Sequence, residues 1–245
     1  MIIDIGNTRC KWLRNNVLKY CSYTKLESLQ IDCKKLTSTD SIYYSSVSPA
    51  KLEEIISLNP NFQGKRINIR SLISEIQISN ISNISNIGSD RLFGAIGARF
   101  LSNGNVMSVD CGTATTINCL SSSNEFVGGM IFPGYMTQKT ALLSKTAIHS
   151  QCFENADKIL SLSTADAIHS GIVSNTCGAI LLAFEEFSKN ISNVPSVFVT
   201  GGNYHYFSSR LVKMGIKHTF DPFLVMRGMA SILRQNINVD YFVKY

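Results

Sequence analysis

Two short stretches of the chain place an acidic residue, a glycine and hydroxyl or amide side chains directly after an apolar run. The first is DIGNT, Asp4 to Thr8, and the second is DCGT, Asp110 to Thr113. Glycine lets backbone N–H groups approach phosphate oxygens, Thr or Asn adds a donor, and the carboxylate can hold a hydrated cation. One such turn also occurs in ordinary hairpins. Two copies, one in each half, predict a paired site for phosphate groups and a metal ion.

The segments around the two turns predict a similar succession of elements in each half. Short apolar runs bounded by Gly, Asn or Ser indicate strands, and longer periodic stretches indicate helices. Strands followed by helices in two similar halves favour an α/β protein of two domains, residues 1–103 and residues 104–245. The expected strands are 1–5, 11–14, 17–22, 66–69, 106–109, 115–120 and 196–200, and the expected helices are 49–58, 91–101, 136–144, 164–189 and 225–234.

Bulk composition indicates a globular protein and limits the classes of partner that we expect. The chain has 245 residues, of which 44% are apolar and 16% charged. No window reaches the roughly 18 uninterrupted apolar residues of a spanning helix, and the N-terminus lacks a signal-peptide pattern. We therefore expect no membrane partner and a cytoplasmic location. The net charge of +6 has no basic run behind it, so it suits small anionic ligands, and we expect no nucleic-acid partner.

The cysteines do not indicate a disulfide framework or a zinc site. Seven of them are scattered singly along the chain, and no C-x-x-C pair occurs. Reduced and mostly buried thiols are the simpler interpretation.

Six motifs carry a resemblance to a known family. DIGNT, DCGTATT (Asp110 to Thr116) and the VFVTGG run ending at Gly202 resemble the two phosphate motifs and the adenosine motif of the acetate and sugar kinase, heat-shock chaperone and actin superfamily. GSDR at 88–91, GGMIFPG at 128–134 and STADAIHSG at 163–171 are similar to those of the type III pantothenate kinases. The resemblance implies two related actin-like (ribonuclease H-like) domains with a nucleotide cleft between them.

The same resemblance implies an activity. Such an enzyme transfers the γ-phosphoryl group of ATP to the terminal hydroxyl of pantothenate and gives 4'-phosphopantothenate, the first step of coenzyme A synthesis. It implies ATP, Mg²⁺ and a monovalent cation, K⁺ or NH₄⁺, as cofactors, and a homodimer.

The resemblance also assigns roles to residues. Asp90 is implied as the proton acceptor, and Asp110 and Asp4 as metal ligands, Asp110 for the monovalent cation and Asp4 toward magnesium. ATP is expected at Asp4, Ile5, Gly6, Asn7, Thr8, Arg9, Cys10, Lys11, Thr113, Gly201 and Gly202, and pantothenate at Gly88, Ser89, Asp90, Arg91 and Thr164.

These residue types suit phosphoryl transfer, which needs in-line positioning and charge neutralisation more than covalent chemistry. Asp90 would orient the attacking hydroxyl and accept its proton late, while Arg91 could hold the pantothenate carboxylate. An acid near a helix N-terminus is also favoured by the helix dipole, so a capping role stays open for Asp90. We further expect the Asp4 and Asp110 carboxylates on opposite walls of one cleft, within about ten ångströms.

One segment departs from the family pattern. Residues 78–87 read ISNISNISNI, which indicates either a loop or edge strand or a low-complexity linker. A tyrosine usually precedes the G-x-D-R motif by seven residues in the family, but Ile81 stands there, so the substrate wall at this point stays open. A non-catalytic regulatory or accessory protein that keeps the ATP fold is the alternative, but retention of the charged residues at positions 4, 90, 91 and 110 favours the kinase.

Overall fold

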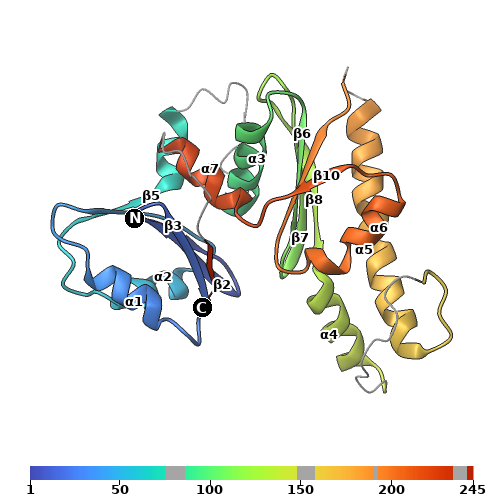
Figure 1. Ribbon diagram of the computed structural model, residues 1–245, viewed down its shortest axis with the longest axis horizontal. Coiled ribbons are helices and arrows are strands. Elements are labelled where there is room, and N and C mark those ends of the chain that lie inside the picture. The colour runs from blue at the N-terminus through green and yellow to red at the C-terminus, as the bar shows by residue number, and fades with distance from the viewer. Residues whose placement is uncertain (76–85, 148–157, 190–192, 234–241, 245) are drawn as a thin grey trace. The chain divides into compact units, whose positions relative to one another are not determined.

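The computed structural model describes residues 1–75, 86–147, 158–189, 193–233 and 242–244 (Figure 1). The chain divides into two units. The first comprises Met1–Phe100 together with Val225–Tyr245, and the second comprises Leu101–Leu224. Each unit is built on its own mixed β-sheet with helices packed against it.

The sheet of the first unit begins with an antiparallel meander. Strands β1, β2 and β3 follow one another as neighbours, β4 pairs parallel with β1, and β5 pairs parallel with β4. The β2–β3 hairpin turns at Asn15 and Asn16, both with positive φ, as a two-residue turn between twisted strands requires. The strands are β1 (Ile2–Ile5), β2 (Arg9–Arg14), β3 (Val17–Ser22), β4 (Ser41–Ser46), β5 (Lys65–Asn68) and β11 (Phe242–Lys244), which pairs parallel with β3.

Helices α1 and α2 cover one face of this sheet (Figure 1). Leu29 and Cys33 of α1 and Ile55 of α2 pack against the buried strand residues Ile3 and Trp12. Helix α2 begins as the sequence predicts, with the Ser48 hydroxyl accepting from the Lys51 N–H and proline in the first turn. The helical segments are α1 (Glu27–Lys34), α2 (Pro49–Ser57), the 3-10 helix η1 (Ile69–Glu75), α3 (Ser89–Leu101) and α7 (Leu224–Ile232).

The second unit repeats the strand order of the first. Strands β6, β7 and β8 form an antiparallel meander, and β9 and then β10 add in parallel beside β6. Numbered within its own unit, each sheet therefore contains the order 3-2-1-4-5, which is the order of ribonuclease H-like folds. The predicted fold class of two related α/β domains is confirmed. The strands are β6 (Val106–Cys111), β7 (Ala114–Leu120), β8 (Phe126–Pro133), β9 (Ser196–Thr200) and β10 (His218–Phe220).

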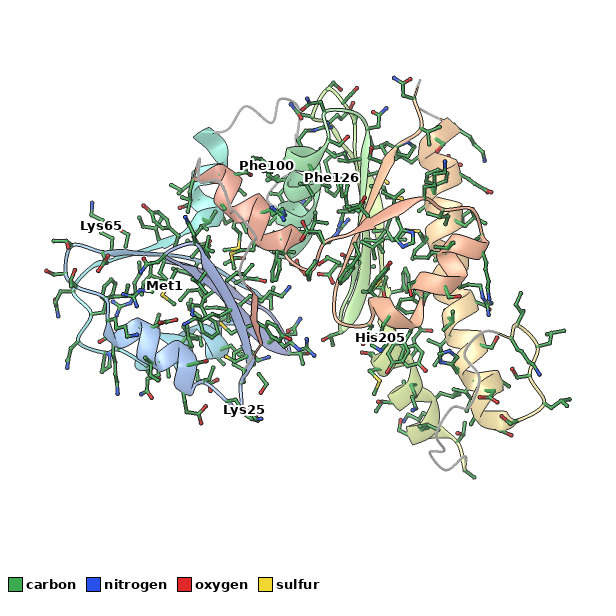
Figure 2. The ribbon with its side chains drawn as sticks, in the orientation of Figure 1. Met1, Lys25, Lys65, Phe100, Phe126 and His205 are labelled. Carbon is green, nitrogen blue, oxygen red and sulfur yellow. The ribbon has the colours of Figure 1, made fainter. Side chains whose placement is uncertain are left out.

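Side chains fill the space between this second sheet and its helices (Figure 2). Helix α5 is long and apolar enough to cross a membrane by length and composition, but its buried residues Ile172, Val173, Cys177 and Ile180 belong to the same core as the strands. Packing against the sheet accounts for that apolar face. The helical segments of this unit are α4 (Tyr135–Lys145), α5 (Thr164–Lys189), the 3-10 helix η3 (Tyr204–Tyr206) and α6 (Ser208–Lys213).

The division into units differs from the sequence-based one at the C-terminal end. Residues 104–245 were expected to form one domain, but Val225–Tyr245 falls with the first unit. Helix α7 packs so closely there that a Cβ atom on Gly228 would overlap the carbonyl oxygen of Phe93 in α3. Residues 76–85, which hold Ile81 and most of the ISN repeat, lie outside the described residues.

Candidate functional site

The first predicted phosphate turn is the tight connection between β1 and β2. The Gly6 N–H donates to the Arg9 carbonyl at 3.1 Å, which closes the turn. The hydroxyl of Tyr23, the residue directly after β3, donates to the Gly6 carbonyl at 2.7 Å and also holds the turn. Asn7, Thr8 and Arg9 are exposed. The turn can therefore offer backbone N–H groups and polar side chains to a ligand.

The remaining residues of this predicted loop divide between the two faces of the sheet. Ile5 and Cys10 are fully buried in the core, so they can serve a nucleotide through their backbone alone. Asp4 and Lys11 are half-buried and stand directly opposite each other in the β1–β2 ladder. Side chains of such cross-strand neighbours lie close together. The ammonium group of Lys11 is therefore near the Asp4 carboxylate.

The GSDR motif forms the start of helix α3. The helix begins at Ser89, two residues earlier than the sequence predicts, so that Asp90 and Arg91 both lie in its first turn and are half-buried. The Leu92 N–H donates to the Gly88 carbonyl at 3.1 Å. A Cβ atom on Gly88 would stand 2.9 Å from Asp90 Oδ1, so the carboxylate folds back over the helix N-terminus. This position suits either a helix-capping acid or a proton acceptor.

The second predicted phosphate turn joins β6 to β7. Asp110 is the penultimate residue of β6, and the turn proper is Gly112 with the exposed Thr113. Asn203 bonds the turn twice: its backbone N–H donates to the Cys111 carbonyl at 2.9 Å, and its side-chain Nδ2 donates to the Gly112 carbonyl at 2.8 Å.

The start of helix α4 holds the next carbonyl of the same turn. The Gly134 N–H donates to the Thr113 carbonyl at 2.9 Å, and the Thr137 hydroxyl donates to the same oxygen at 2.7 Å. Three consecutive carbonyl oxygens of the turn are thus held by neighbouring protein groups. Carbonyl oxygens repel phosphate. Because these three accept hydrogen bonds from other protein groups, the turn is prepared to bind an anion.

Two glycines let these loops approach the second turn. Gly201 has φ +97°, and a Cβ atom there would lie 2.5 Å from both Asp110 Oδ1 and the Cys111 carbonyl. A Cβ atom on Gly134 would overlap the Gly112 carbonyl. Gly201 therefore borders the Asp110 turn. Gly202, which was also predicted from the sequence, follows it in the chain and is exposed.

Sequence reasoning missed Gly134, Thr137 and Asn203 as residues that shape the second turn. The GGMIFPG motif ends on Gly134, so a signal for that position was present. Asn203 and Thr137 carried none, because their role depends on contacts between segments distant in sequence.

Hydroxyl groups flank Asp110 on the sheet. Asp110 is paired with Thr116 of β7 on one side and with Thr200 of β9 on the other. Both threonines are buried, and Thr200 Oγ1 has no hydrogen-bond partner among the described residues. A carboxylate next to hydroxyl oxygens is a donor set that suits a hard cation.

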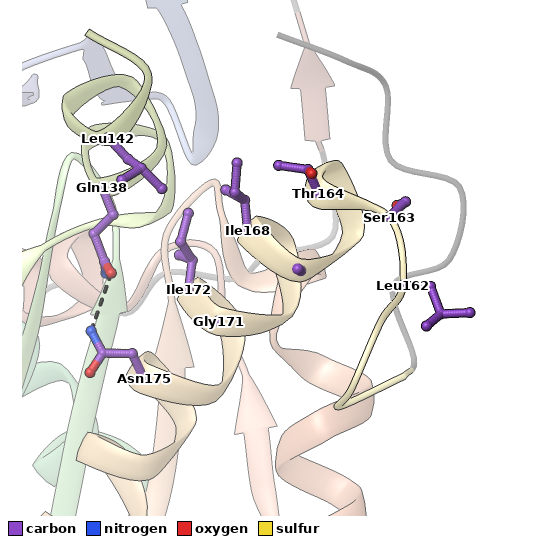
Figure 3. Close-up of a pocket in the computed structure, with 10 residues that line it drawn as sticks. Gln138, Leu142, Leu162, Ser163, Thr164, Ile168, Gly171, Ile172 and Asn175 are labelled. Atoms are coloured by element: carbon purple, nitrogen blue, oxygen red, sulfur yellow. Dashed lines mark hydrogen bonds between the residues drawn. The ribbon is translucent and has the colours of Figure 1, made fainter. Parts of the chain in front are cut away.

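Thr164 lies elsewhere in the second unit, at the start of α5 (Figure 3). Ser163 caps the helix: its hydroxyl accepts from the Asp166 N–H at 3.1 Å and donates to the Asp166 carboxylate at 2.8 Å. A pocket of about 510 Å³ opens between α4 and α5, and Asn175 Nδ2 donates to Gln138 Oε1 at 3.2 Å across it. Its lining residues are Gln138, Leu142, Leu162, Ser163, Thr164, Ala167, Ile168, Gly171, Ile172 and Asn175.

The chemistry of these groups excludes a cysteine nucleophile in the second turn. Burial raises the pKa of the Cys111 thiol well above its usual value, and the Asp110 carboxylate raises it further. The thiol therefore stays protonated.

No cluster of three or more His, Cys, Asp or Glu suited to a metal ion occurs in the described parts of the chain. Any divalent ion would have to depend on single carboxylates together with phosphate oxygens and water, as Mg²⁺ commonly does.

Comparison with known proteins decides the family. The model of the type III pantothenate kinase family matches residues 1–185. The chain belongs to this family. A type III pantothenate kinase of Listeria monocytogenes serovar 1/2a is 28% identical, over 96% of this chain and 97% of the relative. One from Sulfurihydrogenibium is 27% identical, over 92% of this chain and 86% of the relative.

The solved structures support the fold of this type III pantothenate kinase family member. A protein from Campylobacter jejuni, described as a Baf family transcriptional activator, superposes with a TM-score of 0.62 at 21% identity, covering 97% of this chain and 99% of that chain. An ethanolamine utilization protein, EutJ, from Carboxydothermus hydrogenoformans gives a TM-score of 0.50 at 13% identity, covering 94% of this chain and 88% of that chain. Both show that the two-unit α/β fold is shared.

Proposed function

We propose that the chain transfers the γ-phosphoryl group of ATP to the terminal hydroxyl of pantothenate. The observation that carries the proposal is the second turn, Asp110–Thr113, whose carbonyls are held by Gly134, Thr137 and Asn203 in a chain that belongs to the type III pantothenate kinase family. Such a turn, fixed before the ligand arrives, stabilises transferred phosphate without reorganisation.

Each of the two turns is a phosphate-binding element in this proposal. The Gly6–Arg9 turn supplies backbone N–H groups and the exposed Thr8, while Thr113 supplies a hydroxyl from the second turn. Lys11, opposite Asp4 in the ladder, adds positive charge. Asp4 would hold Mg²⁺, which would supply neutralisation of the charge on the phosphate oxygens. Gly201 and Gly202 lie against the nucleoside, because a residue without Cβ lets the backbone approach it.

The acceptor side of the reaction depends on the first turn of α3. Asp90 orients the terminal hydroxyl of pantothenate for in-line attack on the γ-phosphorus. The bond from that phosphorus to the β–γ bridging oxygen breaks, ADP leaves, and the hydroxyl proton passes to the Asp90 carboxylate. Arg91 binds the substrate carboxylate with its planar guanidinium group. Gly88 and Ser89 line the same substrate site, and Thr164 contacts pantothenate from the start of α5.

A monovalent cation, K⁺ or NH₄⁺, would be held beside Asp110 in the proposed enzyme. The buried hydroxyls of Thr116 and Thr200, the latter without a hydrogen-bond partner among the described residues, support this assignment. The cation would offset the negative charge of Asp110 next to ATP and so favour phosphate binding.

We also propose that the enzyme is a homodimer in the cytoplasm. Edge strand β8 and helix α4 expose apolar side chains, among them Val127, Ile131, Met136 and Leu142. Exposed apolar side chains on neighbouring elements mark interaction surfaces when they are contiguous. Sedimentation or light scattering that gives twice the mass of one chain would agree with this, and a monomer at micromolar concentration would not.

A coupled assay of ADP release tests the proposed reaction. With ATP and Mg²⁺ held constant, pantothenate should give rapid turnover, whereas glycerol, sugars and acetate should give the background rate. The Asp90→Asn variant serves as the matched control for enzyme-derived turnover. Equal rates with every acceptor would indicate ATP hydrolysis, and tight ATP binding without any turnover would indicate the non-catalytic alternative.

A further inference from the structure

Tyr135 lies where three parts of the second unit meet. It is the first residue of α4, directly after Gly134, and its side chain is fully buried. Its hydroxyl is 2.6 Å from Nδ1 of His169. Its ring stacks on the ring of Tyr206, with the centroids 3.8 Å apart and the planes at 15°. One side chain thus contacts two other segments in two different ways.

Each contact leads to a part of the candidate site. His169 is in α5, five residues after Thr164 and therefore in the next turn of the same helix. Tyr206 ends η3, which follows the Gly201–Asn203 segment that bonds the second phosphate turn. Gly134, next to Tyr135, bonds that turn from the other side. Helices α4 and α5 also pack directly on each other (Figure 1).

Packing alone does not account for the polar pair. The surrounding core is apolar, with Phe207, Cys177 and Val173 in the same cluster, and the Phe207 ring meets Tyr135 edge to face. A phenylalanine would fill this space without a hydroxyl to desolvate. Burial raises the pKa of the Tyr135 hydroxyl, and the electrostatic interaction with Tyr206 raises it further. The hydroxyl therefore keeps its proton. Either tautomer of His169 leaves the pair hydrogen-bonded, with the donor and acceptor exchanged.

We propose that Tyr135 and His169 are positioning residues that couple the start of α5 to the loops around the second phosphate turn. Because the directional hydrogen bond fixes α4 to α5, the position of α5 sets the position of Gly134 and, through the ring stack, that of η3. A ligand that orders the first turns of α5 therefore orders the second phosphate turn as well. By linkage, ATP raises the affinity for that ligand by the same factor as the ligand raises the affinity for ATP. This coupling rests on the proposed function for its second ligand, pantothenate at Thr164.

The test compares variants by equilibrium binding of a non-hydrolysable ATP analogue, measured by calorimetry with and without saturating pantothenate. Tyr135→Phe keeps the ring stack and removes the hydrogen bond. We expect it to weaken analogue binding about fivefold to tenfold, as loss of a buried hydrogen bond does. The gain in analogue affinity that pantothenate gives the wild-type protein should shrink. In kinetics, KM for ATP should rise more than kcat falls.

His169→Gln and a double variant make the test specific to the pair. Glutamine can still hydrogen-bond Tyr135, so His169→Gln should retain most of the coupling, whereas His169→Leu should lose it. The double variant Tyr135→Phe with His169→Leu should bind the ATP analogue no more weakly than the single variant that binds it less well. Tyr204→Phe is the matched control, because its hydroxyl bonds Nε2 of His218 at 2.9 Å and so joins η3 to β10 rather than α4 to α5. It should leave analogue affinity unchanged.

Several results would overturn the inference. Unchanged analogue affinity in Tyr135→Phe, with a lower melting temperature alone, would reduce the pair to core packing. Equal losses in Tyr135→Phe and Tyr204→Phe would mean that loss of any tyrosine–histidine hydrogen bond in this unit has the same effect. Analogue binding without pantothenate does not depend on the acceptor, so that arm still judges the positioning of the ATP turn if pantothenate proves not to be the substrate. A wild-type protein that binds pantothenate but shows no coupling would refute the link to α5.

Discussion

Substitution of Gly201 by alanine should damage both stability and nucleotide binding. The backbone φ of +97° is one that side chains with a Cβ rarely adopt, and the new methyl group would stand 2.5 Å from Asp110 Oδ1 and from the carbonyl group of Cys111. The backbone strain costs about 1–2 kcal/mol. Forcing a methyl group against backbone atoms adds about 1–3 kcal/mol. We therefore expect the free energy of unfolding to fall by about 2–5 kcal/mol.

The chain offers a control that separates the two contributions. Gly215, which follows α6, also has a positive φ, +77°, but no atom lies within 4 Å of the position its Cβ would take. Gly215→Ala should thus show the backbone strain without the collision. The difference between the two variants, measured by urea denaturation followed by circular dichroism, isolates the contact with the Asp110 turn.

The functional effect should be larger than the effect on stability suggests. Relief of the collision in Gly201→Ala requires Asp110 or the turn after it to move, and a displacement of about 1 Å at a catalytic site can cost a hundredfold in rate. We expect kcat/KM for ATP to fall about a hundredfold in Gly201→Ala and to stay near wild type in Gly215→Ala. Equal stabilities and equal kcat/KM values for the two variants would refute the proposed role of Gly201.

Three further predictions concern single carboxylates. Asp90→Asn should fold and bind ATP normally but lose turnover by about a hundredfold to ten-thousandfold, as followed by ADP release; near-normal turnover would leave Asp90 a helix-capping residue. Potassium or ammonium should activate the enzyme through Asp110 and sodium should do so poorly, whereas equal rates in potassium and a bulky organic cation would remove that role. Burial acts to raise the pKa of Asp32, but hydrogen bonds from Lys19 and Trp12 lower it more. Asp32 should therefore stabilise the fold above the unfolded-state pKa of about 3.9 and lose this effect as the pH falls through the folded-state pKa. Trp12 fluorescence melts should show Asp32→Asn destabilised at pH 7 and much less so near pH 3; a pH-independent loss would contradict this.

The parts of the fold that the sequence predicted are those with strong local signals. Strand β1 and strand β6 are short apolar runs that end at a turn with glycine, and Ser48 with Pro49 marks the start of α2. Edge strand β8 was missed because most of its residues are exposed and its glycines weaken a strand pattern. Helix α1 was missed because its amphipathic signal is weak and includes the buried Asp32.

The candidate site was predictable as two turns but not as a supported structure. The acid and glycine at Asp4 and Asp110 are visible in any local reading of the chain. The contacts of Asn203 and Gly134 with the second turn, by contrast, join segments that lie far apart in sequence. The same reason explains the C-terminal helix: local periodicity predicted a helix at 225–234, but only tertiary packing assigns Val225–Tyr245 to the first unit.

The identity of the product shows whether the phosphoryl group of ATP is transferred to pantothenate. The purified protein would be incubated with pantothenate and with ATP that carries ¹⁸O on the γ-phosphorus, and the products would be separated and weighed by mass spectrometry. Transfer predicts a phosphorylated pantothenate that carries the label, formed in equal amount with ADP, and far slower formation by Asp90→Asn. Labelled inorganic phosphate appearing with ADP, while pantothenate keeps its original mass, would rule out transfer to pantothenate.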